Sequence, residues 1–125
     1  MKPVESMKFT TMLLRTAFLL ALLLGLGDLF KIWTDTPVLV DAHIIAGILV
    51  LGSMWALAVQ AGKVASGAGG PLWAAGFVVL VGAVIALFMR ISGNLWGILH
   101  LVLMLIAMGM AEMGIALSKR KAQVR

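Results

Sequence analysis

The chain has 125 residues, of which 62% are hydrophobic and 12% are charged. A soluble domain averages about 25% charged residues, so this composition excludes an ordinary soluble domain and favours a membrane protein, with residues 1–125 as one domain. The net charge is +5, but the basic residues flank apolar segments instead of interleaving with aromatics, which argues against nucleic acid as a partner. The absence of cysteine excludes disulfides, iron–sulfur clusters and thiolate-ligated haem.

The first two expected helices span residues 9–33 and 38–61. Arg15 interrupts the first apolar segment, and no small-x-small cleavage site precedes Asp28, so we expect a retained helix and not a signal peptide. Pro37 separates the two helices, because proline suits the first turn of a helix and restricts the residue before it.

The third and fourth expected helices span residues 71–90 and 95–118. The Gly- and Ser-rich stretch 66–70 and the sequence Ser-Gly-Asn at 92–94 mark the turns before them. A hydrocarbon core about 30 Å thick requires about 20 apolar residues per helix, so we expect all four helices to span the membrane. All three loops are short, which predicts an all-α membrane protein with an up-down-up-down four-helix transmembrane bundle.

The distribution of basic residues predicts the orientation of the bundle. Two basic residues, Lys31 and Arg90, belong to the end that holds the first and third loops. The other end holds eight, namely Lys2, Lys8, Arg15, Lys63, Lys119, Arg120, Lys121 and Arg125. The positive-inside rule therefore predicts that both termini are cytoplasmic, and we expect a prokaryotic inner membrane.

The two histidines of the chain, His43 and His100, lie within the second and fourth apolar segments. An ionisable residue inside a membrane segment indicates a functional site by default. His43 lies six residues after Pro37, and His100 lies six residues after Asn94. At a rise of 1.5 Å per residue their levels agree to within about 2 Å. The second and fourth helices run in the same direction on a diagonal of the bundle, so we expect the two rings to face each other.

Two opposed membrane histidines are typical of haem ligation, so His43 and His100 are the predicted axial ligands of one haem b near the outer face. Gly47, one turn below His43, and Gly97, close to His100, would leave room for the porphyrin. Residues at the outer end that could receive the haem propionates are Arg90, Lys31 and Trp96. The alternative for each histidine is a hydrogen bond between helices.

The arrangement resembles the haem-binding four-helix unit of membrane b-type cytochromes. The segments DAHIIAG at 41–47 and WGILH at 96–100 are similar to one half of a haem A synthase. That enzyme is a double-length protein with two such halves, whereas this chain has one half and no residue set for oxidising a haem methyl group. The resemblance therefore implies haem binding without synthase activity.

Bis-histidine ligation leaves no open position on the iron, so we expect an electron carrier or accessory subunit more than a stand-alone enzyme. The expected partners are membrane lipid and either other subunits of a respiratory or photosynthetic complex or a second copy of the chain. Quinone stays open as a further ligand. The alternatives are a haem-free structural or assembly subunit and, with less support, a small proton-coupled transporter that uses Glu112.

Arg15 and Glu112 form a second predicted pair. Arg15 lies seven residues after Lys8, and Glu112 lies seven residues before Lys119, so both lie at a similar depth near the cytoplasmic side. The first and fourth helices are neighbours in this topology, which predicts an ion pair between them. The alternatives are separate snorkelling to the headgroups, or proton or quinone chemistry.

Overall fold

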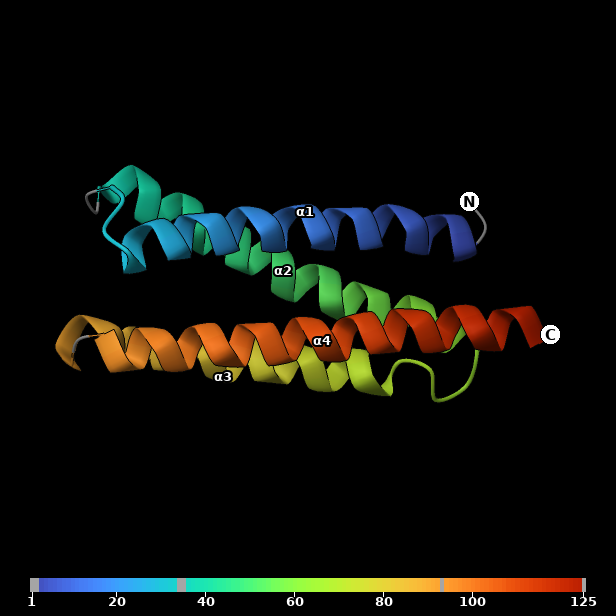
Figure 1. Ribbon diagram of the computed structural model, residues 1–125. Helices are drawn as coiled ribbons and strands as arrows, with labels where there is room; N and C mark the ends of the chain where they lie inside the picture. The colour runs from blue at the N-terminus through green and yellow to red at the C-terminus, as the bar shows by residue number, and fades with distance from the viewer. Residues whose placement is uncertain (1–2, 34–35, 93, 125) are drawn as a thin grey trace.

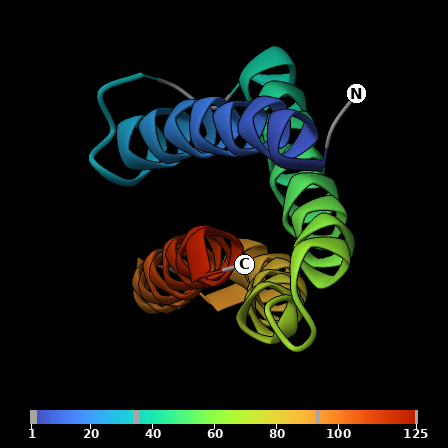
Figure 2. The same ribbon diagram turned by 90° about the vertical axis from the view of Figure 1, so that its right-hand side faces the viewer.

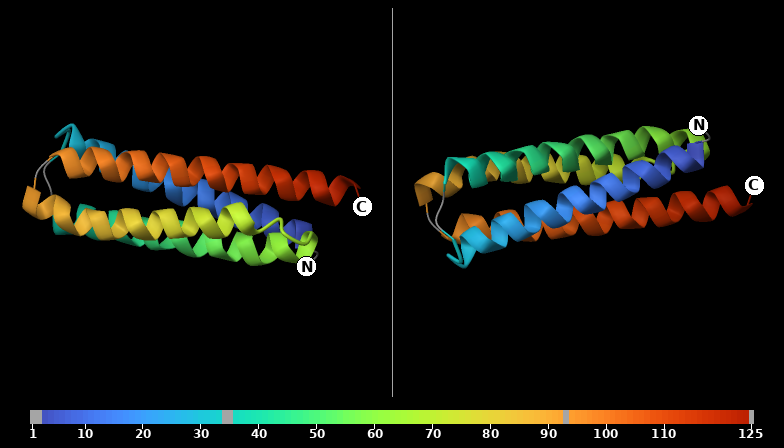
Figure 3. Two further views of the ribbon diagram at one scale, coloured as in Figure 1. Left: turned by 90° about the horizontal axis from the view of Figure 1, so that it is seen from below. Right: turned by 90° about the horizontal axis from the view of Figure 1, so that it is seen from above.

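The computed structural model contains four helices that lie along one another (Figure 1). They are α1 (Pro3–Leu29), α2 (Pro37–Val64), α3 (Gly70–Ser92) and α4 (Asn94–Val124). The structure describes residues 3–33, 36–92 and 94–124, and it describes side chains for 5–33, 36–86 and 95–124. Both chain ends lie at the same end of the molecule in every view (Figures 1 and 3). We call this end the basic end.

The predicted helix order and up-down packing are confirmed. Three helices, α1, α2 and α4, are long and apolar enough to cross a bilayer, and the part of α3 whose side chains are described, Gly70–Ala86, is a shorter apolar segment. These helices indicate an integral multi-pass membrane protein. The helices α2 and α4 both run toward the basic end, as the sequence predicts.

The predicted end of the first helix at residue 33 is wrong, because α1 ends at Leu29. The Ile32 N–H donates to the Gly27 carbonyl at 2.8 Å, and the Lys31 N–H donates to the Asp28 carbonyl at 3.1 Å. This pattern is a Schellman motif, which satisfies carbonyls at a helix end. Lys31 holds the left-handed position with φ 54°, where glycine is the usual residue.

The predicted start of the second helix is confirmed. Pro37 occupies its first turn, and Thr36 caps it by accepting a hydrogen bond at Oγ1 from the Leu39 N–H at 3.3 Å. Three predicted bounds at the basic end are too short. The first helix begins at Pro3 instead of 9, the second continues to Val64 instead of 61, and the fourth continues to Val124 instead of 118. The basic residues after 118 therefore extend a helix instead of ending it.

The bundle consists of two hairpins, α1 with α2 and α3 with α4. In Figure 2, α3 and α4 lie side by side, and α2 descends from α1 toward α3. Both α2 and α4 contact every other helix, whereas α1 and α3 do not touch within the described part of the chain. Of the two diagonals across the bundle, the one between α2 and α4 is therefore shorter than the one between α1 and α3.

Small residues allow this close packing. Half of the buried core is alanine, contributed by all four helices and the α2–α3 loop: Ala17, Ala58, Ala61, Ala65, Ala68, Ala75, Ala107 and Ala111. A Cβ on Gly69 would overlap the backbone carbonyl of Ala58, and a Cβ on Gly76 would overlap the Trp55 indole. Lipid tails are as apolar as leucine, so close backbone contact and van der Waals packing replace the hydrophobic effect between these helices.

We expect Gly69→Ala to destabilise the protein by about 1–3 kcal/mol, because the new methyl group meets the fixed Ala58 backbone instead of a flexible side chain. The matched control is Gly70→Ala, since a Cβ on Gly70 has no atom within 4 Å. Unfolding of both variants by denaturant in detergent micelles measures the difference. Equal stability of the two variants would contradict the tight contact between the loop and α2.

Candidate functional site

The two histidine rings meet, as residue counting predicts. His43 on α2 and His100 on α4 have ring centroids 6.2 Å apart, with an angle of 59° between the ring planes. The contact spans the short diagonal of the bundle, at a level away from the basic end. Both residues are partly buried.

His100 is held by the neighbouring helix α3. Its Nδ1 lies 2.8 Å from the carbonyl oxygen of Gly82. A carbonyl can only accept a hydrogen bond, so Nδ1 carries the proton and donates it. In the neutral ring this leaves the lone pair on Nε2. Metal-ligating histidines commonly have this arrangement, in which the other ring nitrogen donates to a carbonyl and fixes the tautomer.

His43 is held against α1. A Cβ on Gly25 would lie 3.2 Å from His43 Cε1, and the backbone of Ala21 also interacts with the ring. The Nδ1 atom of His43 is buried and has no hydrogen-bond partner in the described part of the chain. A buried polar atom without a hydrogen bond costs about 1–3 kcal/mol, so the close packing of His43 against α1 is maintained at some cost in stability.

Two glycines make the space for these rings. Gly25 on α1 lies against His43, and a Cβ on Gly82 of α3 would lie 3.7 Å from His100 Nδ1 and overlap the end of the Met104 side chain. Sequence reasoning placed neither glycine beside the histidines and missed their contact with them. The sequence offered no signal for this contact, because the predicted end of the first helix at 33 differs from the observed end at Leu29 and shifts the expected level of Gly25.

The other predicted haem contacts are spread around the same end of the bundle. Gly47 is half-buried and faces open space, because a Cβ there would meet no atom within 4 Å. Gly97 is buried and Trp96 is half-buried on α4, while Lys31 is exposed in the α1–α2 loop. The side chain of Arg90 lies outside the described residues. The roles of these five residues at a haem stay predictions.

The predicted ion pair between Arg15 and Glu112 is confirmed. Arg15 Nε donates to Oε1 of Glu112, and a terminal guanidinium nitrogen donates to Oε2, both at 2.8 Å. This two-point contact joins α1 to α4 nearer the basic end. Lys119, two turns further along α4, also interacts electrostatically with Glu112.

A polar contact that the sequence did not predict joins α1 to α2. Gln60 Nε2 donates to Ser6 Oγ at 2.8 Å and to Thr10 Oγ1 at 3.1 Å. The Thr10 hydroxyl donates in turn to the Ser6 carbonyl at 3.0 Å. Side-chain amides and hydroxyls commonly hold membrane helices together in this way. We therefore assign this group to helix association.

Comparison of the chain with protein-family models, curated proteins and solved structures returns no match. The candidate function therefore rests on the residues and geometry described above.

We expect a coupling energy of about 1 kcal/mol between Arg15 and Glu112, in line with half-exposed ion pairs and hydrogen bonds between membrane helices. A double-mutant cycle with Arg15→Leu, Glu112→Leu and the combined variant measures it by unfolding in micelles. Each single variant leaves one charge without its partner, so the double variant should recover part of the loss. Strictly additive effects would contradict the pair.

Proposed function

We propose that the protein is a membrane b-type cytochrome that holds one haem b between His43 and His100. The observation that carries this proposal is the distance between the two rings. An imidazole nitrogen lies about 2.0–2.1 Å from a bound metal ion, and the ring centre lies about 1.1–1.2 Å further back, so two opposed ligands have centroids about 6.2–6.6 Å apart. The observed separation is 6.2 Å.

The surroundings of the two rings also fit a haem. His100 donates from Nδ1 to the Gly82 carbonyl, which leaves Nε2 unprotonated for iron. His43 packs against Gly25 of α1, which holds its ring beside that of His100. Gly25 supplies space beside the His43 ring, and Gly82 supplies space for the end of the Met104 side chain next to His100.

A haem held by two imidazoles supplies one-electron redox chemistry and has no open position for substrate. The protein holds each ring from a different helix, and the apolar helices around them exclude water. We expect Lys31, Arg90 and Trp96 to receive the propionates, since all three belong to the end of the chain opposite the basic end. With the basic end in the cytoplasm, the haem would lie near the outer face of the membrane.

A single redox centre favours a role within an assembly. Such a centre must receive its electrons from another protein or a carrier and pass them on. We therefore propose an electron-transfer subunit of a larger respiratory or photosynthetic complex, or a homodimer, and not a stand-alone enzyme.

The contacts of Glu112 weigh against the transporter alternative. A proton-coupled transporter requires a carboxylate that exchanges protons freely, but both oxygens of Glu112 accept hydrogen bonds from Arg15 at 2.8 Å. Transporter sites also tend to lie near the bilayer midplane, whereas Glu112 lies nearer the basic end. The haem-free subunit alternative differs from our proposal in one visible property, the colour of the purified protein.

We expect purified protein from haem-replete cells to show the visible spectrum of six-coordinate low-spin haem. His43→Leu and His100→Leu should each abolish that spectrum, because one ligand to the iron is lost. Met104→Leu, next to His100 on α4, is the control and should leave it unchanged. A colourless wild-type protein that takes up no added haem would contradict the proposal and favour the haem-free subunit.

We expect Gly25→Val to weaken haem retention by about 5- to 150-fold, because the new side chain would push the His43 ring out of position and overpacking costs about 1–3 kcal/mol. Gly52→Val is the control, since a Cβ on Gly52 meets no atom within 4 Å. Haem transfer to excess apomyoglobin measures retention. Equal retention in the two variants would show that Gly25 does not position the ligand.

A further inference from the structure

A second site lies between α1 and α4 at the basic end, away from the histidines. It is a cavity of about 510 Å³, within the range of small-molecule sites. Its walls include the apolar side chains of Met7, Met12 and Ile115. Met12 is 62% exposed, so the apolar wall continues onto the surface of the bundle. The cavity therefore offers an apolar surface that reaches the lipid.

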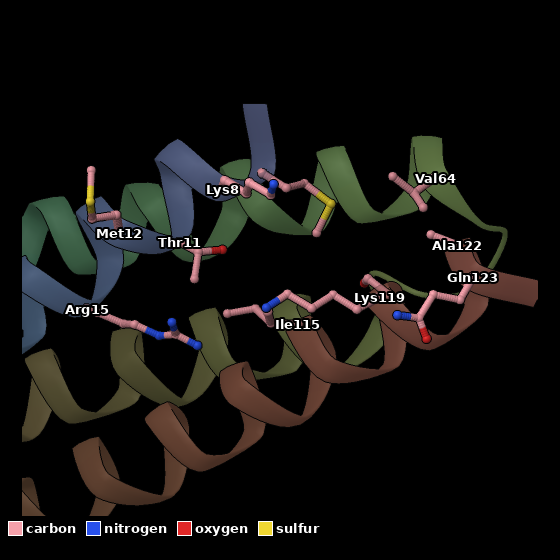
Figure 4. Close-up of a pocket in the computed structure, with 11 residues that line it drawn as sticks. Lys8, Thr11, Met12, Arg15, Val64, Ile115, Lys119, Ala122 and Gln123 are labelled. Atoms are coloured by element: carbon pink, nitrogen blue, oxygen red, sulfur yellow. The ribbon is translucent and has the colours of Figure 1, made fainter. Parts of the chain in front are cut away.

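The charged side chains that line this cavity are basic. Lys8, Arg15 and Lys119 line it, and no acidic side chain does so within the described part of the chain. Figure 4 shows Arg15 and Lys119 extending toward one another from the two helices. Glu112 already pairs with Arg15, so Lys8 and Lys119 carry most of the positive charge that a ligand would meet. The positive charge of the cavity therefore favours an anionic ligand.

The hydroxyl of Thr11 adds a third feature. Thr11 lines the cavity and is only 6% exposed. Within the described residues its hydroxyl makes no hydrogen bond, unlike that of Thr10, which bonds to α1 and α2. Figure 4 shows the Thr11 side chain turned into the space between α1 and α4. The Thr11 hydroxyl can therefore donate a hydrogen bond to a polar ligand in the cavity.

We propose that this cavity binds the headgroup of an anionic phospholipid, with Lys8 and Lys119 on the phosphate and Thr11 hydrogen-bonded to it. The apolar wall at Met12 and Ile115 would carry the start of an acyl chain toward the bilayer core. Basic pockets between membrane helices on the cytoplasmic side are suited to anionic headgroups. The proposal does not depend on haem binding, and it assigns a lipid site to the α1–α4 interface.

Native mass spectrometry of the full-length protein in detergent tests this site. The protein is titrated with dioleoylphosphatidylglycerol or with dioleoylphosphatidylcholine. We expect one phosphatidylglycerol to bind at least about tenfold more tightly than phosphatidylcholine. Lys8→Gln/Lys119→Gln should weaken phosphatidylglycerol binding by about 30-fold, the effect expected for two basic residues close to an anionic headgroup.

The matched control is Lys63→Gln/Arg120→Gln, which removes the same charge from the basic end at two residues that do not line the cavity. It should weaken binding by less than about threefold. Ala122→Trp keeps every charge but fills the cavity, and it should also reduce binding. Equal losses in the two double variants would overturn the proposal, because they would indicate general surface attraction. Displacement of the lipid by millimolar inorganic phosphate would overturn it in favour of a free-anion site.

Discussion

The short diagonal between α2 and α4 is the contact on which the rest of the structure depends. Both helices run toward the basic end, so residues at equal distances from their starts come to the same level. Alanine-rich surfaces let the two helices approach closely, and the rings of His43 and His100 come to 6.2 Å between centroids. The helices α1 and α3 stay apart, and each supports one histidine. Gly25 of α1 packs against His43, and the Gly82 carbonyl of α3 accepts a hydrogen bond from His100.

Most polar side chains within this apolar bundle find hydrogen-bond partners on a neighbouring helix. Inside a bilayer there is no water to satisfy a polar group, so each needs a partner from the protein or from a ligand. Gln60 and Glu112 find partners on α1, and His100 finds the Gly82 carbonyl. In the described part of the chain, four buried polar side-chain atoms lack a hydrogen bond, and only the first belongs to a site where we propose a ligand: His43 Nδ1, Ser53 Oγ, Trp55 Nε1 and Gln60 Oε1.

Prediction from the sequence succeeded where a feature depends on position along a helix. The start of α2 follows from Pro37, and the contacts of His43 with His100 and of Arg15 with Glu112 follow from counting residues. It failed at the end of α1, because the left-handed turn there is held by Lys31, a residue type that gives no such signal.

The sequence by itself determined four apolar helices, their direction, the level of each polar residue and the concentration of basic charge at one end. Its helices are apolar on every side, so no polar face reports how each one is rotated about its axis. Only the tertiary structure decided that rotation. It placed Gly25 and Gly82 against the histidines, turned Gly47 to open space and formed the cavity between α1 and α4, because these features depend on which side chains interlock when the helices pack.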